Sequence, residues 1–470
     1  MTAAAPSSEI LDRVIKAYDV RGRVPDELDA SLAEAIGAAL VEVLAVRADS
    51  GGPGAVVIGH DMRESSPMLV AALARGITAQ GADAVLIGLA STDELYFASG
   101  HRNLPGAMVT ASHNPAGDNG IKLCRSGAAP IGQATGLAEI RSMVEFGVPQ
   151  YTGPSGTIRY DDLLAAYARH LRELVDLSGI RPLRVVVDAG SGMAGHTVPA
   201  VLGSAAGLPA LPLTVEEMYF DLDGTFPHHE ANPLDPANLV DLSRRVRESG
   251  ADLGLAFDGD ADRCFVVDEN GRPVSPSAVT ALISVRELQR HPGATIIHNL
   301  ITSRTVAEVI AEHGGTAVRT RVGHSFIKAR MAETNAVFGG EHSGHFYFAD
   351  FWRADSGMLA ALHVLAALGE APAGTTVSSL LAPYSRYVDS GEVNSTVADT
   401  AAATEMVRAR YCGVDGATCD DLDGLTVSTP RWWFNLRPSN TEPLLRLNVE
   451  AEDEATMARI RDDVLALIRG

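Results

Sequence analysis

The first candidate for chemistry in this chain of 470 residues is Ser112, which stands among other polar residues in the segment Thr110–Pro115 (TASHNP). Residues 106–110 have the small and apolar character of a buried strand, and residues 116–120 are typical of a tight turn. This pattern predicts a hydroxyl on a constrained loop at the carboxyl end of a strand, where open α/β sheets place their chemistry. A lone serine is more often an ordinary turn residue, so the prediction depends on the loops that follow.

An acidic loop, Asp258–Arg263 (DGDADR), is the second candidate. Its carboxylates at Asp258, Asp260 and Asp262 stand at alternate positions and can converge on one hard divalent cation. An EF-hand is the main alternative, but Arg263 stands where that loop needs glycine, and the flanking segments are apolar strands. We therefore predict a magnesium site, because three monodentate carboxylates and one phosphoryl oxygen suit the small coordination shell of Mg²⁺.

The segment Arg437–Pro443 (RPSNTEP) has the composition of a phosphate-binding turn. It combines the guanidinium of Arg437 with the hydroxyls of Ser439 and Thr441, and its two prolines restrict the backbone. A guanidinium can bind two phosphate oxygens at once, and the exposed N–H groups of a turn add further donors. The segment is therefore predicted to bind a phosphate, although as a lone motif it is only moderately specific.

A fourth loop, Gly340–His345 (GEHSGH), offers groups that suit a sugar. Glu341 and Ser343 can accept and donate hydrogen bonds to sugar hydroxyls. Taken alone this signal is weak, because glycine turns rich in histidine also occur as plain loops.

Alternating strands and helices must position these loops. Apolar runs predict strands over 55–61, 84–89, 106–110, 183–190, 251–257, 294–297, 316–320 and 336–341. Helical spacing predicts helices from residue 32 to 43 and over 68–79, 160–177 and 354–369. This repetition indicates three modules with mainly parallel sheets and right-handed crossovers. Residues 9–24, which crowd polar and aromatic side chains around a glycine, are predicted to form a loop that places Arg21.

The last hundred residues have a different character. Predicted strands lie close together in the sequence, over 393–398, 424–428, 432–435 and 444–449, as they do in antiparallel sheets. A helix follows over 453–469, with Asp453 as its N-cap. This part of the chain is therefore predicted to be an α+β module.

Composition excludes several classes of protein. The hydrophobic content of 46% and charged content of 21% are typical of soluble globular proteins, and the net charge of −21 argues against nucleic acid or an anionic membrane surface as a partner. Residues 1–8 lack the features of a signal peptide, and the apolar stretch 358–368 contains His363 and is predicted to be a buried helix. The four cysteines form no Cys-x-x-Cys pair, which predicts reduced thiols in a cytosolic protein rather than disulfides or a metal site.

In combination, the four loops resemble those of the α-D-phosphohexomutase family, in its phosphomannomutase/phosphoglucomutase branch. The serine, metal, sugar and phosphate loops occur in the order of that family, and the resemblance covers essentially the whole chain. It implies an α/β fold with three similar mixed α/β domains and a C-terminal α+β domain around a central cleft, each contributing one loop. The implied domains are residues 1–153, 154–268, 269–373 and 374–470.

The resemblance implies an isomerase that interconverts mannose 1-phosphate and mannose 6-phosphate, and also the glucose phosphates, in the cytoplasm. Ser112 would be carried as phosphoserine and would bind Mg²⁺ together with Asp258, Asp260 and Asp262. A hexose 1,6-bisphosphate would be the intermediate and the priming activator. Candidates for general acid and base by family position are Arg21, Lys122 and His345. Implied substrate-binding residues are Arg263, His324, Glu341, Ser343, Arg437, Ser439, Asn440 and Thr441.

Further expectations concern the local positive field and the partners. Cations must be concentrated where an acidic protein binds an anionic substrate, and Lys328 could either contribute to this field or be an ordinary lysine on a helix surface. Hexose phosphates are the expected partners, with neither nucleic acid nor a membrane, and the chain is expected to be a monomer or a weak homodimer.

Some positions depart from the family and leave alternatives open. Where the third domain of the family often has an Asp-x-Lys segment, this chain has Asn299–Thr302 (NLIT), so a lysine that contacts sugar or phosphate is missing there. His342 does not settle the sugar, whereas Asn440 favours the mannose/glucose branch over the glucosamine branch, which usually has glycine there. The alternatives are a phosphoglucosamine mutase, a metal-dependent sugar phosphatase and a catalytically silent sensor of sugar phosphates.

Overall fold

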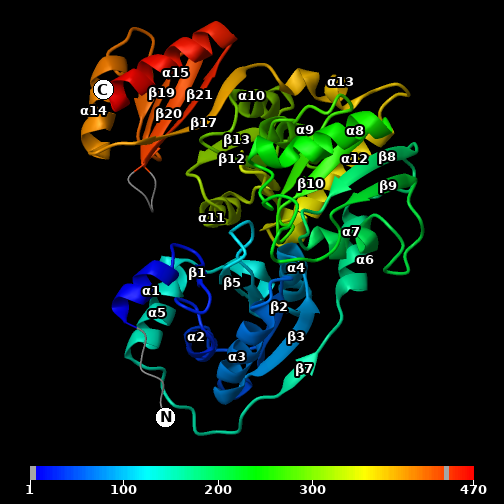
Figure 1. The fold of residues 1–470 in the computed structure, drawn as a ribbon, viewed down its shortest axis with the longest axis vertical. Coiled ribbons are helices and arrows are strands. Elements are labelled where there is room, and N and C mark those ends of the chain that lie inside the picture. The colour runs from blue at the N-terminus through cyan, green and yellow to red at the C-terminus, as the bar shows by residue number, and fades with distance from the viewer. Residues whose placement is uncertain (1–6, 439–443) are drawn as a thin grey trace. The chain divides into compact units, whose positions relative to one another are not determined.

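The computed structural model describes residues 7–438 and 444–470, apart from the side chain of His324. The chain divides into two compact units, which we call the first unit (residues 1–274 and 343–378) and the second unit (residues 275–342 and 379–470). Figure 1 traces the elements of both units along the chain. The domain boundaries inferred from the sequence stay predictions.

The first unit begins with a mixed sheet. Its strand order is β1 (Val20–Arg23), β5 (Asp118–Arg125), β4 (Gly106–Val109), β2 (Ala55–His60), β3 (Asp83–Leu89) and β7 (Ile158–Tyr160), and β6 (Ala129–Pro130) pairs with β5. Strand β2 is parallel to β3 and β4, whereas β5 is antiparallel to β4 and β1. The helices of this part are α1 (Ser8–Val14), α2 (Ala30–Val43), α3 (Ser66–Ala79), α4 (Thr92–Arg102) and α5 (Leu137–Phe146). The predicted β-α-β pattern is confirmed here.

Two local predictions in this sheet are wrong. Arg21 lies on strand β1 rather than on a loop, because residues 20–23 pair with β5, where Arg21 stands opposite Gly120. The turn after the serine loop is also shorter than predicted, since β5 already begins at Asp118. In both cases hydrogen bonds from a distant strand impose extended structure on residues whose types favour a loop.

A second sheet of the first unit has the order β11 (Cys264–Val267), β10 (Leu253–Phe257), β8 (Leu183–Asp188), β9 (Leu213–Met218). Strand β10 is parallel to β8 but antiparallel to β11, so the acidic loop is the connection of a hairpin. The helices here are α6 (Leu164–Leu174), α7 (Ala194–Val201) and α8 (Val240–Ser249). Helix α6 begins four residues later than the predicted start at residue 160, because residues 158–160 pair with β3 as strand β7.

The first unit also contains the antiparallel pair β15 (Phe346–Phe348) and β16 (Ala354–Asp355), followed by α12 (Gly357–Glu370). Residues 357–369 of α12 are all buried, which confirms the prediction that the apolar stretch forms a buried helix. The predicted start at residue 354 is wrong, because residues 354 and 355 pair with β15 instead.

The second unit contains the parallel strands β12 (Thr295–Asn299), β13 (Thr316–Thr320) and β14 (Phe338–Gly340), with β12 between the other two. The helices of this region are α9 (Pro276–Arg290), α10 (Arg304–Glu312) and α11 (His324–Thr334), and a short helix α13 (Val377–Leu381) comes later in the chain. As predicted, the sugar loop begins after a strand, here β14.

The C-terminal part of the second unit is the predicted antiparallel sheet. Its order is β17 (Val388–Thr396), β21 (Leu444–Ala451), β20 (Trp432–Pro438), β19 (Leu425–Ser428) and β18 (Thr418–Asp420). Helices α14 (Thr400–Tyr411) and α15 (Glu454–Arg469) share one apolar core with these strands. Asp453 caps α15, since its side chain accepts the N–H of Thr456 at 2.8 Å, so this prediction is confirmed.

The prediction of four reduced thiols is wrong for two of them. Cys412 and Cys419 form a disulfide, with their Cα atoms 5.9 Å apart. The chain turns back between the end of α14 and β18, which brings the two residues within bridging distance, and their spacing in the sequence gives no sign of this. Cys124 and Cys264 are buried free thiols. Among the described residues, no helix has both the length and the apolar character needed to cross a membrane.

Candidate active site

Ser112 lies on the loop that follows the carboxyl end of β4, as the sequence predicted, and its backbone is strained. Its φ of +52° is in the left-handed region, which a non-glycine residue seldom adopts, and the residue is 3% exposed. The hydroxyl of Thr110 accepts the N–H of Ser112 at 2.9 Å, which helps to fix this turn. The Ser112 hydroxyl donates to Asp258 Oδ2 at 2.7 Å, so the serine loop and the acidic loop meet at this atom.

The three aspartates of the acidic loop form one buried cluster. Carboxylate oxygens of Asp258, Asp260 and Asp262 all lie within 4.8 Å of one another. Two of these oxygens, Asp260 Oδ1 and Asp262 Oδ1, accept no hydrogen bond within the described part of the chain. Buried carboxylate oxygens without donors suit a hard divalent cation such as Mg²⁺, so these residues fit the predicted metal site.

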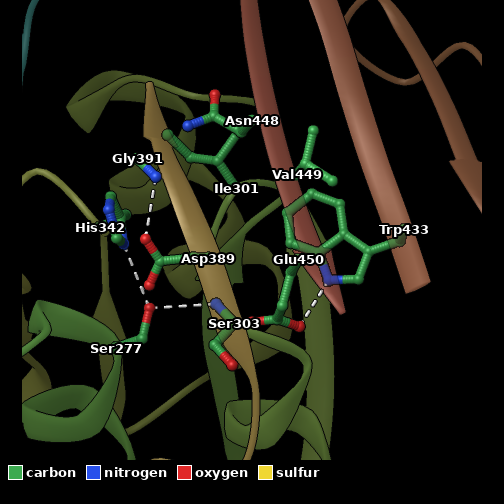
Figure 2. Close-up of a pocket in the computed structure, with 10 residues that line it drawn as sticks. All are labelled: Ser277, Ile301, Ser303, His342, Asp389, Gly391, Trp433, Asn448, Val449 and Glu450. Carbon is green, nitrogen blue, oxygen red and sulfur yellow. Dashed lines mark hydrogen bonds between the residues drawn. The ribbon is translucent and has the colours of Figure 1, made fainter. Parts of the chain in front are cut away.

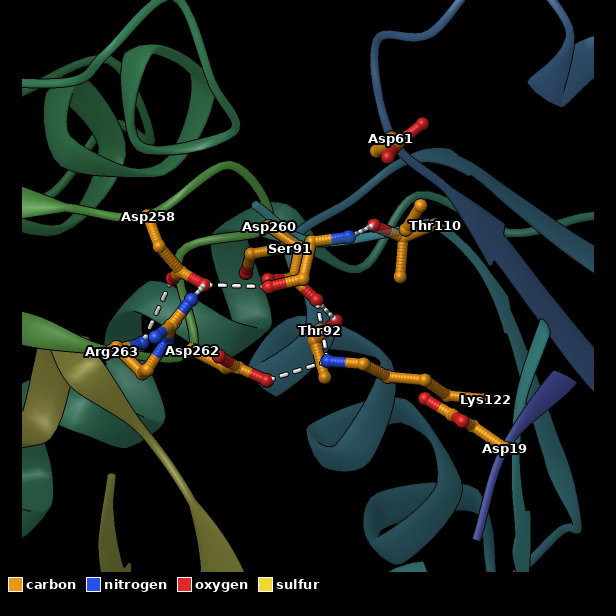
Figure 3. A network of polar contacts seen from close by, with 12 residues as sticks. Asp19, Asp61, Ser91, Thr92, Thr110, Lys122, Asp258, Asp260, Asp262 and Arg263 are labelled. Carbon is orange, nitrogen blue, oxygen red and sulfur yellow. Dashed lines mark hydrogen bonds and ion pairs between the residues drawn. The ribbon is translucent and has the colours of Figure 1, made fainter. Parts of the chain in front are cut away.

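Lys122, on β5, provides positive charge to the same cluster. Its Nζ lies 2.6 Å from Asp260 Oδ2 and 2.7 Å from Asp262 Oδ2. Figure 3 shows the Lys122 side chain pointing at these aspartates. Burial lowers the pKa of Lys122, but the carboxylates of Asp260 and Asp262 outweigh this effect and raise it. The pKa of Asp260 is lowered, because Lys122 more than offsets the effect of burial. Lys122 is therefore a charged ammonium at this site.

Arg263 connects the two loops through a second set of contacts. Its Nε donates to Asp258 Oδ2 at 2.9 Å, and its Nη2 lies 2.6 Å from Nδ1 of His113. Burial, together with the positive charges of Arg263 and Arg21, lowers the pKa of His113 to about 2, so this imidazole is neutral and accepts from Arg263. The pKa of Asp258 is raised, because burial and the neighbouring carboxylates outweigh the attraction of Arg263. We use the name serine–metal site for Ser112, Lys122, Asp258, Asp260, Asp262 and Arg263.

Arg21 contacts the serine loop from strand β1. Its Nε donates to Asp19 at 2.7 Å, and its Nη1 donates to the Asn114 side chain at 2.8 Å and to the Ala111 carbonyl at 3.2 Å. Arg21 therefore lies against the loop that carries Ser112, and its role as a general acid or base stays a prediction.

The N-terminus of α4 supports the acidic loop, and this role was missed in the sequence. The hydroxyl of Thr92 donates to Asp260 Oδ2 at 2.6 Å, and its backbone N–H donates to the Asp260 carbonyl at 2.9 Å. Helix N-termini favour negative charge, so α4 stabilises these carboxylates. Ser91 and Glu94 carry the spacing of an N-cap, and that signal could have located this helix start.

A close backbone approach explains the glycine in the acidic loop. A Cβ atom at Gly259 would lie 2.4 Å from the carbonyl oxygen of Ser112, which no side chain can tolerate. Glycine at this position therefore allows the acidic loop to reach the serine loop.

His345 is held beside the acidic loop by a second carboxylate. Its Nδ1 lies 3.0 Å from Asp355 Oδ2 and 3.8 Å from Asp262 Oδ1. Burial lowers the pKa of His345, but the charges of Asp262 and Asp355 outweigh it and raise the pKa above its ordinary value. Asp355 was missed in the sequence, because nothing near residue 355 signals that β16 brings it to this histidine.

In the second unit, Glu341 is buried at the end of β14. Its Oε1 accepts the Asn299 side chain at 3.2 Å and the backbone N–H of Gly323 at 3.0 Å. Asn299 begins the segment that departs from the family, so this departure acts directly on the predicted sugar-binding carboxylate.

Lys328 on α11 is 3% exposed, which rules out the alternative of an ordinary lysine on the helix surface.

Arg437 lies at the end of β20 beside Glu392. Its Nη2 donates to Glu392 Oε2 at 2.6 Å, and Arg446 shares the same carboxylate at 3.1 Å. Its buried Nη1 has no hydrogen-bond partner among the described residues, and burial lowers the pKa of Arg437.

The other predicted residues of the phosphate loop, Ser439, Asn440 and Thr441, lie outside the described residues. His324 begins α11, but its side chain is not described, and Ser343 of the first unit is half-buried before β15.

A small cavity of the second unit lies beside the sugar loop, and Figure 2 shows its lining. His342, the residue after Glu341, faces Ser277 with 3.3 Å between Nδ1 and the hydroxyl oxygen. Burial is the main cause that lowers the pKa of His342. The lining residues are Ser277, Ile301, Ser303, His342, Asp389, Gly391, Trp433, Asn448, Val449 and Glu450.

Comparison with known proteins assigns the family. Residues 12–146, 165–271 and 276–387 match the phosphoglucomutase/phosphomannomutase alpha/beta/alpha domains I, II and III, and residues 392–467 match the C-terminal domain. A protein of Xanthomonas campestris named "Phosphohexose mutases" is 40% identical over 458 residues, which are 97% of this chain and 99% of that protein. A phosphomannomutase of Escherichia coli is 40% identical over 462 residues, covering 97% and 98% of the two chains.

A crystal structure of a phosphoglucomutase/phosphomannomutase family protein from Burkholderia thailandensis has the same fold. It matches with a TM-score of 0.84 and 34% identity, covering 97% of both chains. The present chain therefore belongs to the phosphoglucomutase/phosphomannomutase family, the phosphohexomutases. It is an enzyme of the isomerase class, and its four-domain α/β fold is the one that the sequence predicted.

Proposed function

We propose that this phosphohexomutase interconverts mannose 1-phosphate and mannose 6-phosphate, and also the corresponding glucose phosphates. The observation that carries the proposal is the buried Ser112 hydroxyl, 2.7 Å from a carboxylate of the acidic cluster. A hydroxyl beside a site that fits a divalent cation is suited to accept and return a phosphoryl group.

In the proposed reaction Ser112 carries the phosphoryl group. A hydroxyl of the sugar attacks phosphorus while the bond from phosphorus to Ser112 Oγ breaks, which gives a hexose 1,6-bisphosphate and a free serine. The bisphosphate then returns its other phosphate to Ser112 and leaves the sugar phosphorylated at the new position. The same bisphosphate would prime enzyme molecules whose serine is unmodified.

Mg²⁺ held by Ser112, Asp258, Asp260 and Asp262 would neutralise charge on the transferred phosphoryl group. Lys122 and Arg263 add fixed positive charge at the same place, which a dianionic substrate needs in a protein of net charge −21. Magnesium is thus proposed as the cofactor, and the chain's own cations support it.

His345 is the proposed general base that takes the proton of the attacking sugar hydroxyl. Its Nδ1 faces Asp355, which assigns the proton to Nδ1 and leaves Nε2 able to accept one. Arg21 and Lys122 are proposed to assist through their charge and hydrogen bonds. The proposal also assigns the reaction to the cytoplasm, because charged sugar phosphates cross membranes poorly.

Sugar and phosphate recognition is proposed for the remaining loops. Glu341 and Ser343 would bind the 3- and 4-hydroxyls, so the 2-hydroxyl, which alone distinguishes mannose from glucose, would be little contacted. The phosphate that is not reacting would be bound by Arg437, whose Nη1 has no partner among the described residues. Further proposed phosphate and substrate contacts come from His324, Ser439, Asn440 and Thr441.

The decisive experiment measures turnover of mannose 1-phosphate and glucose 1-phosphate side by side, with Mg²⁺ and a trace of glucose 1,6-bisphosphate. We expect both 6-phosphates to form at comparable rates, and Ser112→Ala to reduce turnover by about 10⁴-fold or more. A matched control is Ser191→Ala, because Ser191 is also buried and also has a left-handed φ, of +54°, while its backbone bonds Tyr219 and Asp223, which the proposal does not use.

Each other outcome has a distinct meaning. Turnover of only one sugar would keep the mechanism and contradict the indifference to the 2-hydroxyl. Turnover of glucosamine 6-phosphate alone would indicate a phosphoglucosamine mutase. Release of inorganic phosphate at the rate of substrate loss would indicate a phosphatase, and no turnover after priming would indicate a sensor.

A further inference from the structure

Arg63, just after β2, has one of the most completely bonded side chains of the first unit. The side chain is 1% exposed, and all five N–H donors of its guanidinium form hydrogen bonds. One donor, Nε, bonds the carboxylate of Asp61 at 3.2 Å. The other four bond backbone carbonyls of the serine loop, those of Ser112 (2.9 Å), Asn114 (2.7 Å), Pro115 (2.8 Å) and Asp118 (2.9 Å).

These four carbonyls explain why a guanidinium is needed. The loop from Ser112 to Asp118 curls so that four of its carbonyl oxygens face one guanidinium, and the buried carbonyl of Ser112 would be costly to leave without a donor. Arginine offers five donors in a rigid planar fork, whereas lysine offers three on a single flexible atom. Only an arginine side chain can therefore bond the whole loop and Asp61 at once.

Arg63 is itself held in place from several sides. Asp61 Oδ1 accepts both the backbone N–H of Arg63 at 3.1 Å and the hydroxyl of Ser66 at 2.6 Å. The ring of Phe226 lies 5.1 Å from the guanidinium carbon, and a Cβ atom at Gly224 would lie 2.8 Å from Arg63 Cα. A segment of the second sheet's domain thus packs against this arginine, so its position is determined before any substrate binds.

The contact with Ser112 joins Arg63 to the chemistry. The Ser112 carbonyl oxygen that accepts Nη2 is the same atom that a Cβ at Gly259 of the acidic loop would meet first. The Ser112 backbone adopts a left-handed φ of +52°, which persists only when its surroundings enforce it. Bonds to the carbonyl of Ser112 and to those of the residues after it supply that enforcement.

We propose that Arg63 is a positioning residue for phosphoryl transfer, whose guanidinium holds the serine loop so that Ser112 Oγ faces the acidic cluster. Within the described residues Arg63 makes no hydrogen bond to the hydroxyl or to the cluster; it bonds the loop backbone and Asp61, and its charge also interacts with that of Asp260. The inference rests on the proposed role of Ser112 as the phosphoryl carrier.

The test uses Arg63→Lys and Arg63→Gln in the full chain. The rate at which glucose 1,6-bisphosphate phosphorylates Ser112 is followed by intact mass, and kcat and KM are measured for mannose 1-phosphate. A nucleophile displaced by about 1 Å loses about 10²-fold in rate, so we expect both variants to lose about that much in phosphorylation rate and kcat, with KM nearly unchanged. A residue that merely supported folding would change the folded fraction and leave the rate per folded molecule intact.

Arg172→Gln is the matched control. Arg172 also donates to three backbone carbonyls, those of Val201, Gly203 and Pro209, but at a loop that does not carry the serine. We expect its rate per folded molecule to equal that of the unmodified enzyme. If Arg63→Gln does not fold, Arg63→Lys and the milder Asp61→Asn, which weakens the bond to Nε, carry the test.

The outcomes separate this inference from the proposed function. Normal phosphorylation rates per folded molecule in the Arg63 variants, or a rise in KM with kcat unchanged, would overturn the inference alone. If the unmodified enzyme itself takes no phosphoryl group on Ser112, the proposed function fails and this inference fails with it.

Discussion

The serine–metal site of the first unit and the Arg437 region of the second unit differ in how their positively charged side chains are paired. In the serine–metal site, Lys122 bonds two buried aspartates and Arg263 bonds the third, while Asp260 Oδ1 and Asp262 Oδ1 accept no hydrogen bond among the described residues. In the Arg437 region, one guanidinium nitrogen bonds Glu392 while the other buried nitrogen has no partner among the described residues.

This difference indicates which positively charged side chains are preorganised and which one awaits an anionic ligand. Paired buried charges keep their geometry when no ligand is present, as transfer of a phosphoryl group requires. A buried donor without an acceptor is costly, so an anion that supplies the acceptor gains that energy on binding. We infer that the first region is built for reaction and the second for recognition, and the four predictions below test this contrast.

The largest effect is expected when the acidic cluster loses one charge. Asp260→Asn should reduce activity by about 10²–10³-fold and raise the Mg²⁺ concentration needed for half-maximal activity, because the cation loses a charged ligand. Activity is measured against Mg²⁺ concentration, with Asp241→Asn, which changes a carboxylate bonded to Tyr219, as the control. An unchanged Mg²⁺ dependence in Asp260→Asn would contradict the assignment of this cluster.

Removing the unpaired donor should affect binding rather than reaction. Arg437→Gln should raise KM by about 10–10²-fold with a smaller change in kcat, because a charge-assisted hydrogen bond to phosphate is lost. Arg446→Gln is the matched control, since Arg446 shares Glu392 but is more exposed, and its KM should change by less than about threefold. A loss confined to kcat in Arg437→Gln would instead assign this arginine to the reaction.

Removing the disulfide should have a smaller effect, a loss of stability in the C-terminal sheet that carries Arg437. Replacing both Cys412 and Cys419 by serine should lower the free energy of unfolding of the C-terminal sheet by about 2 kcal/mol, because a short loop is no longer closed in the unfolded chain. Thermal unfolding is compared with and without reductant. Reductant should destabilise only the unmodified chain, and an equal effect on the double variant would show that the bridge does not form.

The smallest effect concerns pH and a histidine of the first unit. His229 has one ring nitrogen 3.0 Å from Asp188 and the other 2.8 Å from the Glu230 carbonyl. Burial lowers the pKa of His229, but the bond with Asp188 outweighs it, so the folded-state pKa lies above the ordinary value of 6.5. The stabilisation is therefore fully present below about pH 6.5 and is lost as pH rises through the folded-state pKa.

His229→Gln should accordingly lose less thermal stability between about pH 6 and pH 8 than the unmodified chain does. His228→Gln is the control, because its ring stacks on Tyr219 and, among the described residues, no carboxylate lies within hydrogen-bond distance of it. Parallel pH profiles of the unmodified chain and His229→Gln would contradict the stabilisation by Asp188.

Much of the fold follows from local patterns in the sequence. Apolar runs such as those that form β2, β8 and β10 have only one way to bury their side chains, and Asp453 caps its helix through its own next residues. The places where prediction was wrong are those where a distant strand supplies the hydrogen bonds. Arg21 joined a strand because β5 pairs with it, and residues 158–160 did so because β3 does.

The sequence by itself determined the residue types of the four loops and their order, and these indicated the family and the class of chemistry. The reason is that a serine hydroxyl, alternating aspartates and an arginine have intrinsic chemical properties that can be read without a structure. Only the tertiary structure decided which groups meet. Thr92 bonds Asp260 and Arg63 bonds the serine loop across long sequence separations, and Asp355 reaches His345 because β16 pairs with β15. Such contacts depend on how strands and helices pack, which no local pattern encodes, and the bridge between Cys412 and Cys419 has the same origin in a turn of the chain.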